Sequence, residues 1–242
     1  MMNRLLSLIP AALVALVFGF VGAWGYSLTP LQGSATRAWL MDHPDVLKDM
    51  AQRLQDQENA KRLAGIRTDL TTPFPGAVLG NPKGSVTLVE FSDYGCTFCR
   101  HSVPDVQNLI AANPDLRVVV REWPIFEGSE AAARMALAAA KQGKYAAFHD
   151  AMFSGGPPSR DTILAAAKKA GIDLKQAQID GGSPAATLEL QKNYALARQM
   201  GFDGTPAFIA GDRVIAGALG EAQLADAIAS ARNMRPADST EG

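Results

Sequence analysis

Hydrophobic and polar residues are distributed along the chain in three successive patterns. The first is an almost wholly apolar stretch from Leu5 to Tyr26, and no charged side chain occurs between Leu5 and Thr36. A helix over 5–26 would rise roughly 33 Å, enough to cross the hydrocarbon core of a bilayer. We therefore expect a membrane-spanning helix at residues 5–26, followed by a linker that completes an N-terminal segment over residues 1–36.

The same apolar stretch also fits a signal sequence. Signal peptides usually have a core of about 7–15 apolar residues before a small-x-small cleavage site, and Val21-Gly22-Ala23 has that form. Trp24 and Tyr26, however, are typical of residues at a membrane–water interface. An uncleaved anchor is the favoured interpretation, cleavage is the alternative, and a buried core helix is the third. Either of the first two exports the rest of the chain, and Arg4 orients the N-terminus inside.

The second pattern predicts a helical spacer over residues 37–66. Asp42-His43-Pro44-Asp45 is typical of a helix start, because proline is tolerated in the first turn and an acidic residue there is favourable. Apolar residues on both sides of this start recur at about seven-residue spacing: Leu40, Leu47, Met50 and Leu54. Two such repeats fit a helix that lies on its own domain or on the membrane, and equally a helix through which the protein forms homo-oligomers.

The third pattern, over residues 70–234, mixes strands and helices. Apolar, β-branched runs predict strands at 86–92 and 116–123, with a helix between them. Such a strand–helix–strand unit predicts a parallel pair with a right-handed crossover. Short apolar runs at 204–210 and 213–216, joined by Gly211-Asp212, predict a hairpin. The fold class is therefore α/β.

The rest of this third region is helical or polar. Alanine-rich segments divided by glycine and proline predict a helical insertion at about 129–200. A closing helix is expected at 221–234, and the polar residues 235–242 are expected to form a disordered tail. Ala77-Val-Leu-Gly80 is a candidate for a short edge strand.

The candidate chemistry lies directly after the first of these strands. Asp93, Tyr94 and Gly95 break the strand, and the two cysteines of the chain follow as Cys96-Thr97-Phe98-Cys99 at the start of a helix. The N–H groups and dipole of a helix N-terminus favour a thiolate over a thiol, so Cys96 is the expected nucleophile. Arg100 and His101 either add to this effect or are merely solvated. Cys99, one turn later, can attack a mixed disulfide formed at Cys96.

Two other interpretations of the cysteine pair are less consistent with the sequence. A tetrahedral zinc site needs four ligands, and the three histidines are too scattered to complete one, so we expect no metal and no other cofactor. A structural disulfide closing so short a loop would restrain the unfolded chain little. The formal net charge is −1, without a basic run, which argues against nucleic-acid binding. The sequence thus favours a redox-active Cys96–Cys99 disulfide.

Two segments together resemble the DsbA-like family of periplasmic thiol–disulfide oxidoreductases. These are Glu90-Phe-Ser-Asp-Tyr-Gly-Cys-Thr-Phe-Cys-Arg100 and Gly204-Thr-Pro-Ala-Phe208. The resemblance covers roughly residues 70 to 234 and implies a thioredoxin fold with an inserted helical domain. Within the family, the chain is most similar to a branch that includes Com1-type outer-membrane proteins and the suppressor-of-copper-sensitivity oxidoreductases, some of which form oligomers through an N-terminal helix.

The resemblance also implies roles for individual residues. Pro206 is expected to be cis and to pack opposite Cys96, with Thr205 and Pro206 binding an extended substrate segment through the backbone. Glu90 resembles the family's buried acid beneath the redox pair, which can exchange a proton with Cys99; the alternative is a solvated carboxylate at the strand end. Tyr94 and Phe98 are expected to form an apolar rim for substrate, or simply to pack.

The direction of the reaction remains open at this stage. Strongly oxidising family members have Pro-His between the cysteines, whereas this chain has Thr97-Phe98, and Thr205 resembles the reductase- and isomerase-leaning members. The resemblance implies exported proteins with cysteines as substrates and a membrane redox partner, either DsbB-like or DsbD-like. An alternative function is copper(I) binding by the same two thiolates in copper tolerance, because soft thiolates suit that ion. The expected location is the periplasm, tethered to the inner membrane by residues 5–26 or free after cleavage.

Overall fold

The computed structural model describes residues 9–27 and 31–233 and divides the chain into two compact units, residues 1–55 and 56–242. The first unit contains α2 (Ile9–Ser27), α3 (Leu31–Asp42) and the first part of α4 (Pro44–Ala64). In the part of the chain that the structure describes, no helix has the length and apolarity that a membrane crossing requires. The membrane-spanning helix expected at 5–26 is therefore not found, and residues 5–8 of that span lie outside the described chain.

The segment before α4 also differs from expectation. Residues 31–36, which were expected to belong to a linker, form the first turns of α3, because this stretch contains no proline and its leucine and alanine favour a helix. The expected helix start at Pro44 is confirmed. His43 separates the two helices, and its ring stacks on Trp39 with 4.4 Å between ring centroids.

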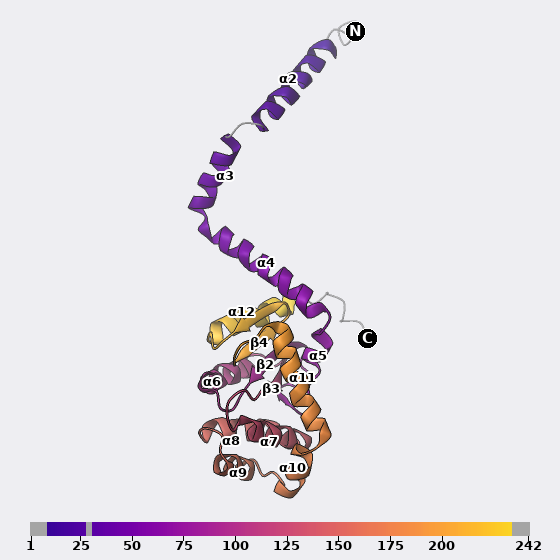
Figure 1. The fold of residues 1–242 in the computed structure, drawn as a ribbon. Helices are drawn as coiled ribbons and strands as arrows, with labels where there is room; N and C mark the ends of the chain where they lie inside the picture. The colour runs from indigo at the N-terminus through magenta and orange to yellow at the C-terminus, as the bar shows by residue number, and fades with distance from the viewer. Residues whose placement is uncertain (1–8, 28–30, 234–242) are drawn as a thin grey trace. The chain divides into compact units, whose positions relative to one another are not determined.

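The second unit is built on a five-stranded sheet with strand order β1-β3-β2-β4-β5, of which Figure 1 labels β2, β3 and β4. The strands are β1 (Val78–Gly80), β2 (Val86–Ser92), β3 (Leu116–Glu122), β4 (Ala207–Ala210) and β5 (Arg213–Ala216). β2 and β3 are parallel, and the other three pairings are antiparallel. The predicted parallel pair, the edge strand β1 and the β4–β5 hairpin are thus confirmed.

Helices cover both faces of this sheet. The face that carries Leu88 and Val118 packs in one core with α6 (Thr97–Ala112) and α12 (Glu221–Asn233). The opposite face, with Phe91 and Val119, packs in a second core with the end of α4, α5 (Arg67–Thr71) and α11 (Pro184–Met200). Because both faces are buried, β2 and β3 read as nearly continuous apolar runs rather than as alternating ones.

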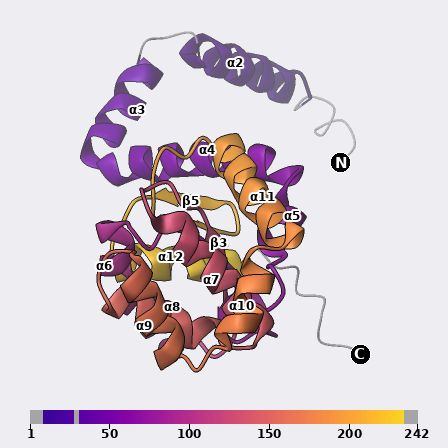
Figure 2. The ribbon, with the colours of Figure 1, turned by 60° about the horizontal axis from the view of Figure 1, so that its bottom comes forward.

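The expected helical insertion is present as α7 (Ser129–Lys141), α8 (Tyr145–Ser154), α9 (Arg160–Lys169), α10 (Leu174–Gly181) and α11. α7 contacts each of the next three helices, and the four lie together in both views (Figure 1 and Figure 2). Its buried positions are mostly alanines, which allow close approach. Local signals set the ends: Ser159 caps α9 in a capping box with Thr162, and Gly201 ends α11 with φ of 75°.

A buried arginine, Arg121, links the helices on the second face to the sheet. Arg121, on β3, is fully buried and pairs with Glu189 of α11 at 2.8 Å between Nη1 and Oε1. Its other N–H groups donate to the backbone carbonyls of Asp69, Leu70 and Thr72. One guanidinium therefore fastens the end of α5 and the insertion's last helix to the central sheet.

Candidate active site

The two cysteines lie where β2 passes into α6. Cys96 is the N-cap residue of α6, with extended backbone, and the N–H of Cys99 points at its sulfur from 3.5 Å. A first-turn N–H aimed at a cap atom is the geometry that stabilises negative charge there. The cysteines carry free thiols in this structure; Cys96 is 2% exposed and Cys99 0%. The predicted position of Cys96 at a helix N-terminus, with Cys99 one turn later, is found in the structure.

A loop from a distant part of the chain closes over Cys96. The peptide bond between Thr205 and Pro206 is cis, as the family resemblance implied. The Cys96 thiol donates to the Thr205 carbonyl, with 3.1 Å between sulfur and oxygen. Pairing of Ala207 with Phe91 holds this loop beside the end of β2. The carbonyl of the cis peptide bond before Pro206 thus lies against the Cys96 sulfur.

The turn at residues 93–96 between β2 and α6 is called the redox turn below. Glu90, on the strand before this turn, is buried rather than solvated at a strand end. It is 2% exposed and lies on the same face of β2 as Leu88, which is the α6 side of the sheet. Burial raises the pKa of Glu90 to about 7. Burial also raises the pKa of the Cys99 thiol, and the Glu90 carboxyl contributes to that rise. The Glu90 carboxyl thus disfavours the Cys99 thiolate, and proton exchange between the two groups stays a prediction.

Asp93 anchors the redox turn to the loop after β3, which sequence reasoning did not anticipate. One carboxylate oxygen accepts the Gly95 N–H at 2.7 Å, and the other accepts those of Ile125 and Phe126 at 2.6 and 2.9 Å. A Cβ at position 95 would come within 2.6 Å of the Ser129 hydroxyl, so this close approach requires glycine. These hydrogen bonds hold Phe126 close to Gly95, the residue before Cys96, and the side chains of Ile125 and Phe126 are exposed.

Tyr94 fits the packing alternative rather than the substrate rim. Its side chain is 2% exposed, and its hydroxyl donates to the Glu122 carboxylate at 3.1 Å. The cause is the direction of the strand end, which turns residue 94 toward the helical insertion and packs its ring against Phe148 and Phe153. Phe98 is 63% exposed and remains a candidate for contacting a substrate.

Glu122 is the buried acid that sequence reasoning missed. It ends β3, is 1% exposed, and accepts a hydrogen bond of 2.6 Å from the hydroxyl of Tyr145. The available signal was its alternation with Val118 and Val120, which places its side chain on the same face of the sheet as Glu90. His149 is buried in the same group of side chains.

The basic residues after the cysteines point away from the sulfurs or into solvent. Arg100 donates to the backbone carbonyl of Phe153, and its guanidinium carbon lies 6.0 Å from the centre of the Phe153 ring. His101 is exposed. The structure therefore does not support the expected help of Arg100 at Cys96; its contacts tie α6 to the helical insertion instead.

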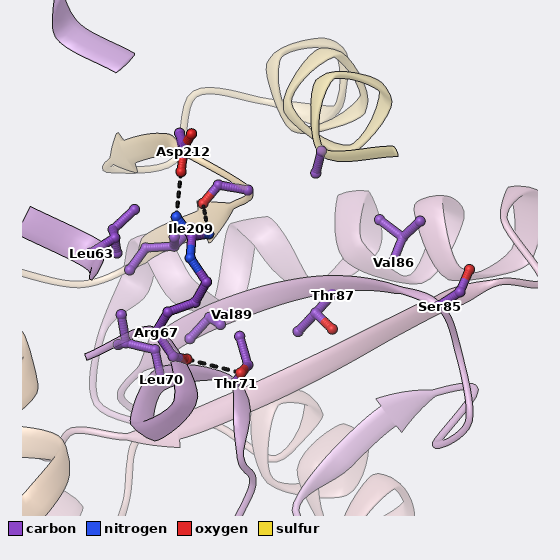
Figure 3. A pocket seen from close by; sticks show the side chains of 12 residues that line it. Leu63, Arg67, Leu70, Thr71, Ser85, Val86, Thr87, Val89, Ile209 and Asp212 are labelled. Atoms are coloured by element: carbon purple, nitrogen blue, oxygen red, sulfur yellow. Dashed lines mark hydrogen bonds and ion pairs between the residues drawn. The ribbon is translucent and has the colours of Figure 1, made fainter. Parts of the chain in front are cut away.

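The described residues contain no group of three or more His, Cys, Asp and Glu side chains that could hold a metal ion. A pocket of about 440 Å³ lies at the opposite end of β2 from the cysteines, between Leu63, Val86 and Ile209 (Figure 3). Arg67 reaches across it to the Gly211 carbonyl and the Asp212 carboxylate. Its twelve lining residues include neither cysteine nor the cis-proline loop, so we assign this pocket no part in thiol chemistry.

The sheet, the two cysteines at a helix N-terminus and the cis-proline beside them define a thioredoxin-like protein with a dithiol site. A family model described as the DSBA-like thioredoxin domain matches residues 87–229, and the chain belongs to this family. The resemblance seen in the sequence is thereby confirmed.

Solved structures agree with this assignment. A thioredoxin-like oxidoreductase from Silicibacter pomeroyi is 43% identical, with a TM-score of 0.66 over 70% of this chain and 99% of that one. A periplasmic thioredoxin-like protein from Salmonella enterica serovar Typhimurium is 28% identical, with a TM-score of 0.59 over 69% and 95% of the two chains.

Curated relatives are much longer proteins. The Na⁺/H⁺ antiporter NhaA of Herminiimonas arsenicoxydans is 31% identical over 142 residues, which are 58% of this chain and 23% of the antiporter. Across the curated antiporters that it matches, the chain spans between 23% and 33% of their length. These partial matches assign no transport activity to this chain.

Proposed function

We propose that this protein is a thiol–disulfide oxidoreductase that acts on exported proteins containing cysteines, by reversible oxidation of Cys96 and Cys99. The observation that carries the proposal is the position of the Cys96 sulfur between the N–H of Cys99 and the carbonyl of Thr205. The first contact aims an N–H group of the helix N-terminus at the sulfur. The second leaves the backbone beside Pro206 in place to align an extended substrate segment with the sulfur.

The reaction exchanges two electrons and balances as follows. A substrate thiolate attacks Cys96 of the protein disulfide, the Cys96–Cys99 bond breaks, and Cys99 leaves as a thiolate that takes a proton from Glu90. A second substrate thiolate then attacks the substrate sulfur of the mixed disulfide and releases Cys96. The substrate is oxidised to a disulfide and the protein is reduced to a dithiol. In the reverse direction, Glu90 accepts the proton from Cys99 as that sulfur attacks.

Each turnover leaves the pair in the opposite redox state, so a second partner has to restore it. The family resemblance supports a DsbB-like membrane partner if electrons are removed and a DsbD-like one if they are supplied. A periplasmic location is supported by the Salmonella relative, which is described as periplasmic. It also agrees with a chain whose cysteines are confined to the redox pair, because other thiols would pair wrongly in an oxidising compartment.

Equilibration of the full chain with reduced and oxidised glutathione tests the proposal. We expect a single two-electron transition, which is monitored by alkylating the free thiols and measuring the mass of the chain. A Cys96→Ser variant should lack this transition. A midpoint near about −120 mV would identify a disulfide donor, and one near about −200 mV or lower a reductase or isomerase. A wild-type chain that shows no reversible transition would overturn the function.

The N-terminal spacer supports a further part of the proposal, self-association through residues 37–66. Leu47, Met50 and Leu54 of α4 are 54–60% exposed although they are apolar and share a helix face. We expect light scattering to give a multiple of 25.6 kDa. Changing Leu47 and Leu54 to lysine should give the monomer mass without altering the glutathione equilibrium. A monomeric wild-type chain at tens of micromolar would exclude self-association.

A further inference from the structure

The residues around Glu122 form a closed polar group under the redox turn. Its Oε1 accepts hydrogen bonds from the hydroxyls of Tyr145, at 2.6 Å, and Tyr94, at 3.1 Å. The Tyr94 hydroxyl also lies 3.3 Å from Nδ1 of His149. The four side chains come from β3, the redox turn and α8, and all are at least 97% buried. The redox turn is thus joined to the helical insertion through one carboxyl group.

A structural role alone does not require an acid at this position. The side-chain oxygen of a glutamine could accept the same two hydroxyls without placing a titratable group in the interior. Burying a carboxyl group is costly when it ionises, and burial raises the pKa of Glu122 to about 8. The two tyrosine hydroxyls act in the opposite direction, and the carboxyls of Asp93 and Glu90 add to the rise.

The other members of the group keep their protonation state near neutral pH. Burial raises the pKa values of Tyr94 and Tyr145 well above their usual range. Burial lowers the pKa of His149 to about 4, so its ring is neutral. Glu122 is therefore the member that gains or loses a proton in the range where thiol–disulfide exchange takes place.

Glu122 is also close to Glu90, the other buried acid on this face of the sheet. β2 and β3 pair in parallel with Glu90 opposite Val120 and Ser92 opposite Glu122, so the two acids are diagonal neighbours on one face. With a rise of about 3.3 Å per residue and a strand spacing of about 4.8 Å, their Cα atoms lie roughly 8 Å apart. The Glu90 carboxyl adds to the rise in the pKa of Glu122, so ionisation of Glu90 disfavours ionisation of Glu122.

We propose that Glu122 is a positioning residue that holds a second titratable proton beside the redox centre. Its protonation is coupled to the redox state of the cysteines through Glu90 and Tyr94, without contact between Glu122 and the sulfurs. This inference rests on the proposed function. Reduction of the disulfide by two glutathione thiols forms the two protein thiols and one glutathione disulfide. Negative charge that appears on a protein sulfur or on Glu90 during this exchange strengthens the hold of Glu122 on its proton. While Glu122 stays neutral, Glu90 remains free to ionise and to accept the proton of Cys99.

The test is the pH dependence of the glutathione equilibrium constant of the full chain between pH 6 and 9.5. Glu122→Gln should match the wild type at pH 6, where both carry a neutral group, and diverge from it as the pH passes about 8. The divergence should reach about tenfold for each unit by which the pKa of Glu122 differs between the redox states. Glu127→Gln, which changes an exposed acid of the same region, should superimpose on the wild type.

A second variant keeps the acid and changes only its environment. Tyr145→Phe removes a hydrogen bond that favours the Glu122 carboxylate, so the pKa of Glu122 should rise. The pH at which the profile of this variant departs from that of Glu122→Gln should therefore be higher than it is for the wild type. If Glu122→Gln does not fold, carbon-13 titration of the Glu122 carboxyl in both redox states of the wild type decides the question. Parallel profiles for wild type and Glu122→Gln, or one Glu122 pKa common to both redox states, would overturn the inference. Absence of any transition in the wild type would instead overturn the proposed function.

Discussion

Serine in place of Cys96 is expected to slow thiol–disulfide exchange by roughly 10³-fold to 10⁶-fold, the range seen when a nucleophile is removed from an active site. Cys96 is the cysteine whose sulfur contacts both the first-turn N–H of Cys99 and the Thr205 carbonyl. A serine hydroxyl in that position can be neither oxidised to a disulfide nor displaced from one. The loss of exchange rate is measured by monitoring the turbidity that develops as dithiothreitol reduces insulin in the presence of the protein.

Serine in place of Cys99 is the matched comparison, because it removes one sulfur from the same turn of α6. This variant keeps the nucleophile but lacks the thiol that resolves the intermediate, so a mixed disulfide between Cys96 and the substrate should accumulate. Non-reducing gels and mass spectrometry would detect it at one bond per chain. Equal trapping by both variants, or trapping through Cys99 alone, would show that the roles of the two sulfurs are assigned wrongly.

The sequence was most informative where local chemistry determines the structure. The β-branched runs predicted β2 and β3, the break at Asp93 to Gly95 predicted the redox turn, and Cys-x-x-Cys at a helix start predicted the N-cap position of Cys96. Each of these depends on residues within one turn or one strand. The membrane span expected at 5–26 depended instead on the length of one apolar run, and the described part of the chain contains no such helix.

The remaining features of the site depend on contacts between distant parts of the chain. Tyr94 looked like a rim residue, because an aromatic side chain next to two reactive sulfurs is often exposed. Its partners Glu122 and Tyr145 lie 28 and 51 positions further along, and only the packing of the insertion on the sheet brings all three together. Strand alternation shows which face Glu122 occupies, but it does not reveal the two hydroxyls that bind it.

Replacing Arg121 with methionine is expected to lower the free energy of unfolding by about 3–5 kcal/mol, as in other buried ion pairs that lose one partner. The variant leaves the Glu189 carboxylate, which is only 13% exposed, without its cation. It also removes the donors to the carbonyls of Leu70 and Thr72. Urea unfolding monitored by tryptophan fluorescence measures the change. Arg213→Met, which breaks a partly exposed pair with Asp226, should cost no more than about 1 kcal/mol.

A double variant separates the two causes of this loss. Changing Glu189 to leucine in the Arg121→Met background removes the buried charge left behind, so the stability should partly return, while the unpaired carbonyls keep it below that of the wild type. Because Arg121 faces the core opposite the sulfurs, the glutathione equilibrium of the folded variants should match that of the wild type. A loss below 1 kcal/mol in Arg121→Met would show that water replaces the guanidinium at little cost. A shifted equilibrium would show that the two faces of the sheet are coupled, and that the second core contributes to the redox chemistry.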